Sequence, residues 1–185
     1  MTDLNNAKVL IISSAGFEQS ELEFPRDQLR AKGATVHVAT PDGTAIKGWD
    51  GDDWGDVTAA DAKIEDIDIA DFDALVLPGG QINPDLLRAM PAVVDKIRAF
   101  ADSGKPVAAI CHAPWLLIEA DVIKGRKATS YHSISTDMKN AGAVWEDSEV
   151  VCDKALITSR NPDDLDAFCA KIIEEVKEGR HKRAA

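Results

Sequence analysis

The sequence lacks several features that mark specialised classes of protein. None of its apolar runs is long enough to cross a bilayer, and residues 1–6 show neither the basic nor the apolar region of a secretory signal. There are only three cysteines, Cys111, Cys152 and Cys169, an odd number without a paired motif. A disulfide framework is therefore not expected, and these absences favour a protein of the reducing cytoplasm.

Positive charge is also scarce. Lys and Arg number 21 against 32 Asp and Glu, which gives a formal net charge of −11. This balance argues against nucleic acid or an anionic membrane as the main partner. The four histidines are scattered and form no His-x-x-x-His pair, so neither a metal site nor another cofactor is expected.

The chain alternates between short apolar runs and helical patterns. Its 185 residues, 45% of them apolar, suit one domain over residues 1–185, with residues 180–185 as a flexible tail. Strands are predicted at residues 8–14, 35–39, 73–77, 106–110 and 127–130. Helices are predicted at 19–32, 84–90, 91–103, 114–120, 134–141 and 161–179, with a hairpin or loop over 43–61 and a hairpin of 144–151 with 155–159. The pattern is that of an α/β fold with a mainly parallel sheet.

The strand over residues 106–110 is followed at once by Cys111 and His112, and Pro114 then permits a helix to begin. A strand, a sharp turn and a helix form a nucleophile elbow, which holds a reactive side chain clear of the sheet. The helix N-terminus is expected to lower the pKa of the Cys111 thiol below about 8.5. The alternative is that Cys111 is a small buried apolar residue.

Two further strand ends carry candidate residues. In α/β sheets, sites lie beyond the carboxyl ends of the strands. Glu18 follows the first strand and could reach the sulfur, or could simply be an acid at a helix start. Gly79 and Gly80 follow the third strand, where the backbone must turn and expose its N–H groups. The N–H groups of Gly80 and His112 could then form an oxyanion hole.

Six runs together resemble those of a known family and follow its order over nearly the whole chain. They are Gly16-Phe17-Glu18 with Glu21-Leu22, residues 75–80, residues 109–112, residues 125–131, Asp137-Met138 with Asn140-Ala141-Gly142, and residues 158–162. The chain resembles the PfpI-type intracellular protease family, in the superfamily of the parkinsonism-associated protein deglycase. The resemblance implies the flavodoxin-like sandwich of the class I glutamine amidotransferases, with helices on both faces of the sheet.

The sequence departs from these relatives at two points. Ala113 stands where the family often has Gly after the Cys-His pair, and its methyl group could narrow the pocket. The glutamine amidotransferases also need a His-x-Glu far beyond the cysteine, and none occurs after Cys111. A glutaminase activity is therefore not expected.

The resemblance also implies roles for individual residues. His112 would be the base, the alternative being a structural or solvent-facing histidine. The carboxyl of Glu18 would be protonated and hydrogen-bonded to sulfur. An acid from a neighbouring subunit would orient the histidine, and Asp85 matches it after a one-residue insertion; the alternative is an ordinary Asp in a first helical turn. His132 could line the pocket or lie on a surface loop.

The residues, taken with the resemblance, predict a cysteine-dependent, stress-protective enzyme of the PfpI type without a cofactor. Cys111 would attack a carbonyl of either a peptide or a 2-oxoaldehyde such as methylglyoxal and its protein adducts. The first substrate implies an intracellular peptidase and the second a glyoxalase or deglycase. The alternative is a redox sensor or stress-protective chaperone with an oxidisable Cys111. The resemblance further implies a homodimer or larger homo-oligomer.

Overall fold

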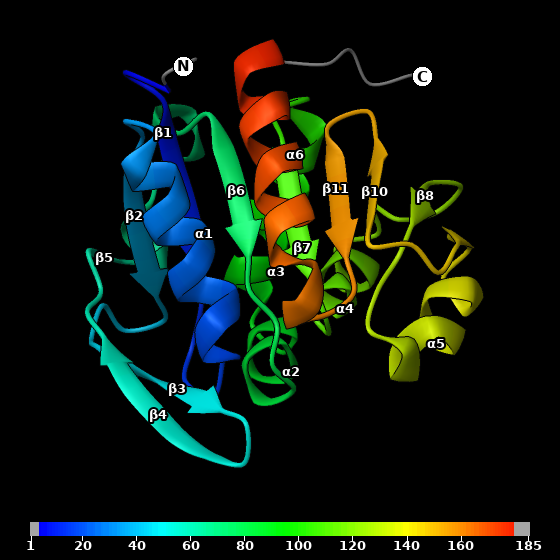
Figure 1. The fold of residues 1–185 in the computed structure, drawn as a ribbon, viewed down its shortest axis with the longest axis horizontal. Helices are drawn as coiled ribbons and strands as arrows, with labels where there is room; N and C mark the ends of the chain where they lie inside the picture. The colour runs from blue at the N-terminus through cyan, green and yellow to red at the C-terminus, as the bar shows by residue number, and fades with distance from the viewer. Residues whose placement is uncertain (1–3, 180–185) are drawn as a thin grey trace.

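A seven-stranded sheet forms the centre of the computed structural model, which describes residues 4–179 (Figure 1). The strand order is β10-β11-β7-β6-β1-β2-β5, and only β10 and β11 pair antiparallel. The strands are β1 Lys8–Ile12, β2 Thr35–Thr40, β5 Ala62–Lys63, β6 Ala74–Leu77, β7 Val107–Ile110, β10 Val150–Asp153 and β11 Leu156–Ser159. Two further pairs are the antiparallel hairpin β3 Ile46–Asp50 with β4 Asp53–Thr58, and the parallel β8 Lys127–Ala128 with β9 Val144–Trp145.

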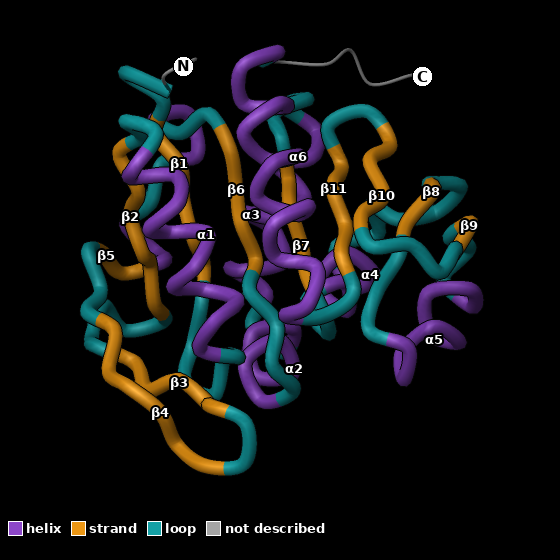
Figure 2. The backbone as a smooth tube through the Cα atoms, in the orientation of Figure 1, coloured by secondary structure: helices purple, strands orange, loops and turns teal. Residues whose placement is uncertain are grey.

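Helices cover both faces of the sheet. The α-helices are α1 Gln19–Ala31, α2 Ile82–Arg88, α3 Pro91–Asp102, α4 Pro114–Glu119, α5 Ser135–Asn140 and α6 Leu165–Glu178. Figure 2 shows α1 and α6 in front of the sheet and α3 behind it. No helix among residues 4–179 is long and apolar enough to cross a membrane.

The sheet separates two apolar cores because successive strand residues point to opposite faces. In β1, Leu10 and Ile12 belong to the core under α2, α3 and α4, while Ile11 belongs to the core under α1 and α6. All three side chains are fully buried. This two-sided burial explains why the strands read as continuous apolar runs. The predicted flavodoxin-like α/β fold is confirmed.

The main difference from the prediction concerns residues 144–151, which do not form one strand. Val144 and Trp145 pair with β8, and a new strand, β10, begins at Val150 to pair with β11. The predicted hairpin partner of residues 155–159 is therefore β10 alone, and residues 144–145 belong to a different sheet. The predicted flexible tail at 180–185 lies outside the described residues.

Candidate active site

Cys111 occupies the sharp turn that joins β7 to α4. Its backbone has φ 63°, in the left-handed region that residues with a side chain rarely adopt. Its N–H donates to the carbonyl of Ser159 at 3.1 Å, and its carbonyl accepts from the N–H of Tyr131 at 2.8 Å. Two neighbouring segments therefore hold the predicted elbow in this conformation. The side chain is 6% exposed, and the cysteine is not in a disulfide.

Glu21 is the carboxyl that acts on the Cys111 sulfur. It lies in the first turn of α1 and is fully buried, and its Oε2 accepts the N–H of Gly79 at 2.9 Å. Its Oε1 is buried without an N–H or O–H donor among the described residues. The Cys111 side chain and the N–H of Gly80 also hydrogen-bond with this carboxyl. A buried carboxyl oxygen that accepts no hydrogen bond is a favourable site for a proton.

The expectation that Glu18 approaches the sulfur is therefore corrected. Glu18 precedes α1 with an extended backbone (φ −62°, ψ 119°), and its carboxyl accepts from the hydroxyl of Ser20 at 3.3 Å. It is half-buried at the rim of the same cleft. Glu18 lies before the helix, where the extended backbone leaves its side chain at the rim, whereas Glu21 lies within the helix on its buried face.

Burial governs the protonation of the Glu21–Cys111 pair. Burial, followed by the charge of Glu18, raises the pKa of Glu21 to about 8. Burial, followed by the charge of Glu21, also raises the pKa of the Cys111 thiol, although the N–H groups of Gly80 and His112 lower it. The resting structure thus opposes the expected depression of the thiol pKa. The six-residue α4 has too little dipole to outweigh burial. The pair holds at least one proton at neutral pH.

His112 lies directly against the thiol. Its Nδ1 is 3.2 Å from the Cys111 sulfur, and its Nε2 is 3.1 Å from the hydroxyl of Ser133. Burial, followed by the charge of His132, lowers the pKa of His112, so the imidazole is neutral at neutral pH. A neutral imidazole with one nitrogen on the sulfur can accept the thiol proton.

The turn at Gly79-Gly80 brings backbone donors to the sulfur. Gly80 has φ 73°, and a Cβ there would lie 2.5 Å from the backbone nitrogen of Glu18. At Gly79 a Cβ would lie 2.6 Å from both the Cys111 Cβ and the Glu21 Oε2. Only glycines allow the backbone this close, so that the Gly80 N–H reaches the thiol.

Asn83, which the sequence did not single out, fastens this turn to the end of β1. It is fully buried, and its Oδ1 accepts from the N–H of Ser14 at 2.7 Å. Its Nδ2 donates to the carbonyls of Pro78 and Gly79 at 2.9 and 3.2 Å. One side chain therefore connects two strand ends beside the nucleophile.

The thiol opens into a cleft of about 470 Å³ at the carboxyl edge of the sheet. Eleven residues line it: Glu18, Glu21, Trp49, Gly51, Gly80, Gln81, Cys111, His112, Tyr131, Ser133 and Pro162. A cleft of this size suits a small molecule or one side chain of a larger one. The structure thus brings together four predicted positions, Glu18, Gly80, Cys111 and His112.

Two of the predicted site residues, His132 and Asp85, do not line this cleft. His132 is exposed and packs at a tilt against Tyr131, with 4.4 Å between ring centres, while the Tyr131 ring stacks on that of His112 at 4.7 Å. Asp85 is exposed on α2, and His112 contacts Ser133 at the nitrogen that an acid would occupy. Within residues 4–179, no group of three or more His, Cys, Asp or Glu side chains could hold a metal ion.

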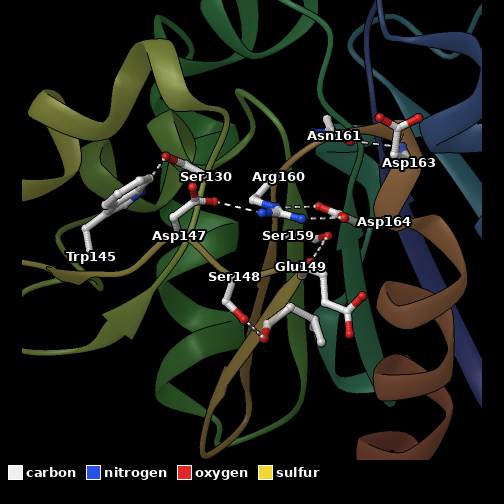
Figure 3. Close-up of polar contacts among 11 residues, drawn as sticks. Ser130, Trp145, Asp147, Ser148, Glu149, Ser159, Arg160, Asn161, Asp163 and Asp164 are labelled. Carbon is white, nitrogen blue, oxygen red and sulfur yellow. Dashed lines mark hydrogen bonds and ion pairs between the residues drawn. The ribbon is translucent and has the colours of Figure 1, made fainter.

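An ion-pair network supports the strand end next to the elbow (Figure 3). Arg160 donates two hydrogen bonds of 2.9 Å to the buried carboxylate of Asp164 and one of 2.8 Å to Asp147. Beside it, the hydroxyl of Ser159 donates to the carbonyl of Glu149 at 2.6 Å. Because the Ser159 carbonyl accepts the Cys111 N–H, this network fixes one side of the nucleophile turn.

A flavodoxin-like sheet with a cysteine at the elbow, a histidine beside it and a buried carboxyl behind it defines a class of cysteine-dependent α/β proteins. A family model described as DJ-1/PfpI family matches residues 7–175. The chain belongs to the DJ-1/PfpI family.

Individual relatives are similar over most of their length. Protein/nucleic acid deglycase 2 of Escherichia coli (strain K12) is 47% identical over 163 residues, 87% of this chain and 92% of the relative. Putative cysteine protease YraA of Bacillus subtilis (strain 168) is 40% identical over 171 residues, 92% and 98% of the two chains. The crystal structure of Drosophila melanogaster DJ-1beta has a TM-score of 0.83 at 32% identity and covers 93% of this chain and 94% of its own.

Proposed function

We propose that this protein is a stress-protective enzyme that uses Cys111 to convert 2-oxoaldehydes and their adducts on proteins to hydroxy acids. The observation that carries the proposal is the position of the Cys111 sulfur, 3.2 Å from Nδ1 of His112 and against the Glu21 carboxyl. The cleft of about 470 Å³ suits a small carbonyl compound better than an extended peptide. The deglycase names of relatives such as the Escherichia coli protein support the same substrate class.

The chemistry would begin with transfer of the thiol proton to Nδ1 of His112. The thiolate then attacks the aldehyde carbon and forms a hemithioacetal, whose oxygen receives hydrogen bonds from the Gly80 and His112 N–H groups. The protonated His112 returns its proton to this oxygen, and the neutral imidazole then moves the proton of the former aldehyde carbon to the adjacent carbonyl carbon through an enediol, which leaves a thioester. Water hydrolyses the thioester to the hydroxy acid and regenerates the thiol. The overall reaction adds one water to methylglyoxal and gives lactate, without an external oxidant or reductant.

The direct test is turnover of methylglyoxal and of methylglyoxal-modified peptides, with lactate measured as the product. The wild type should form lactate, Cys111→Ser should form none, and His112→Ala should lose about a hundredfold in turnover. Absence of lactate from the wild type would contradict the proposal. Cys152→Ser is the matched control, because Cys152 lies on β10 outside the cleft.

Peptide hydrolysis is the second candidate, since one relative is named a putative cysteine protease. The same thiolate and oxyanion donors would then form an acyl-enzyme. A fluorogenic peptide series assayed beside methylglyoxal separates the two activities. Mass spectrometry of Cys111 after mild peroxide tests the remaining alternative, a redox sensor, which would show ready oxidation of Cys111 without turnover of either substrate.

We also propose that residues 1–185 form one domain and that the active unit is a homo-oligomer in the cytoplasm. Asp85 would support His112 across a subunit interface, because the described part of the chain places no carboxylate at Nε2 of that histidine. Mixing Cys111→Ala with Asp85→Ala subunits should restore some activity, since each supplies what the other lacks. A fully active monomer in sedimentation would contradict this, as would verified subunit exchange without restored activity.

A further inference from the structure

The rim of the cleft carries acidic side chains that are not part of the Cys111, His112 and Glu21 site. Glu18 is half-buried there, and after burial and a hydrogen bond from Ser20, the charge of Asp50 is the next influence on its pKa. The residues that line the cleft include no Lys or Arg. The neighbouring Arg160 is already paired with Asp164 and Asp147. The field at the mouth is therefore negative.

An aromatic side chain stands next to this carboxylate. Trp49 and Glu18 form an isolated parallel bridge, and the Trp49 N–H donates to the carbonyl of Phe17 at 2.7 Å. The indole N–H donates to the carbonyl of Gly51 at 2.8 Å, and Trp54 packs edge-on at 5.5 Å between ring centres. The ring is thus held in a fixed orientation on the cleft wall. Aromatic faces beside carboxylates bind cations and the alkyl stems that carry them.

We propose that Glu18, together with Asp50 and Trp49, selects substrates that carry positive charge next to the reacting carbonyl carbon. The favoured class is an adduct on a lysine or arginine side chain or beside a basic residue, and phosphate-bearing adducts are disfavoured. This inference rests on the proposed function for its substrate chemistry. It concerns residues at the rim and not those that act on the sulfur.

The first experiment measures the potential at the thiol without requiring turnover. Cys111 is modified with aminoethyl (cationic) and sulfonatoethyl (anionic) methanethiosulfonate, and the rate at this cysteine is followed by peptide mass spectrometry. After normalisation to a free cysteine peptide, the cationic probe should react about tenfold faster than the anionic one. Glu18→Gln should reduce this ratio about fivefold.

Asp66→Asn is the matched control, because it removes the same unit of charge from an exposed position outside the cleft. It should change the ratio by less than about twofold, since exposed charges beyond a Debye length are screened. A wild-type ratio equal to that of the free peptide would overturn the proposal. A ratio that Glu18→Gln leaves unchanged would overturn it as well.

The second experiment uses turnover. Three peptides carry the same methylglyoxal hemithioacetal on cysteine and differ only in one flanking residue: Lys, Gln or Glu. The wild-type kcat/KM should fall in that order, and Glu18→Gln should compress the Lys-to-Glu ratio about fivefold. Equal values for all three overturn the selectivity while the proposed function stands. If the wild type converts none of them, the proposed function fails, and the probe rates alone decide the selectivity.

Discussion

The carboxyl of Glu21 and the thiol of Cys111 form a buried pair in which the charge of one group opposes the charge of the other. The Gly79 N–H holds one Glu21 oxygen at 2.9 Å, and burial raises the pKa of both members. The two groups therefore titrate together, and neither can be assigned an independent ionisation. The proton that remains on the pair is available to stabilise negative charge on sulfur as the thiolate forms.

The first prediction concerns the titration of this pair. In Glu21→Gln, thiolate absorbance should develop in one step, at a lower pH than the upper step of the wild type. The reason is that ionised Glu21, which raises the pKa of the thiol, is gone. Glu18→Gln should move the upper step less than Glu21→Gln does, since the charge of Glu18 acts on the pair mainly by raising the pKa of Glu21. Identical curves for the wild type and Glu21→Gln would show that the carboxyl has no influence.

Glu21 should also make the free energy of unfolding depend on pH. Its pKa rises from 4.5 to about 8 on folding, so between these values the folded protein keeps a proton that the unfolded chain has lost. The stabilising contribution of this neutral carboxyl is complete below pH 4.5 and is lost as pH rises through 8. Its full size is on the order of 5 kcal/mol.

Urea unfolding at pH 5 and pH 9 measures this effect. The free energy of unfolding should fall between pH 5 and pH 9 in the wild type. In Glu21→Gln this fall should be smaller by a few kcal/mol. Glu18→Gln serves as the control, because the half-buried carboxyl that it removes has a smaller effect on the pH dependence of unfolding. An unchanged difference in Glu21→Gln would mean that Glu21 has the same pKa in the folded and unfolded states.

A third prediction concerns the acidic limb of activity. The charge of His132 lowers the pKa of His112, after the larger effect of burial. His132→Gln removes that charge, so the pKa of His112 rises and the base is protonated at a higher pH. The acidic limb of kcat/KM should move upward by a few tenths of a pH unit. His37→Gln, in β2, should leave the limb in place, and equal shifts in both variants would contradict the assignment.

Asn83 provides the fourth prediction. Asn83→Asp replaces the Nδ2 donor with an oxygen facing the carbonyls of Pro78 and Gly79, which should cost about 3 kcal/mol of unfolding free energy. Asn140→Asp makes the same change at an exposed position in α5 and should cost less than about 0.5 kcal/mol. Urea unfolding at pH 7.5 compares the two. Equal losses would mean that the Asn83 network does not hold the turn.

The elbow was predictable because its signals are local. A short apolar strand, Cys111-His112 and a helix-compatible Pro114 follow one another directly, and the Gly79-Gly80 pair marks the second turn by its own chemistry. The structure places all of them at one edge of the sheet. The carboxyl ends of parallel strands lie at the same edge of a sheet whatever the details of packing. The sequence alone was therefore sufficient to predict that the two turns lie together.

The choice between Glu18 and Glu21 depended on packing. Both are carboxylates near the start of α1, but Glu18 precedes the helix with an extended backbone, while Glu21 lies in the first turn on the buried face of the helix. A signal was present, since Glu21 falls in the buried stripe with Leu22, Pro25 and Leu29. A charged residue on an apolar helix face indicates a buried partner. Asn83 gave no such signal, because its partners are backbone groups. Ser14 is 69 residues away in sequence, and Pro78 and Gly79 are five and four residues away.

The left-handed backbone at Cys111 has an evolutionary consequence. Glycine would adopt φ 63° without strain, whereas a cysteine there costs on the order of 1–2 kcal/mol. Selection for folding stability alone therefore gives no reason to keep a thiol at this turn. A lineage that stopped using the sulfur would be free to drift toward residues that relax the turn, and it could lose the chemistry without losing the fold.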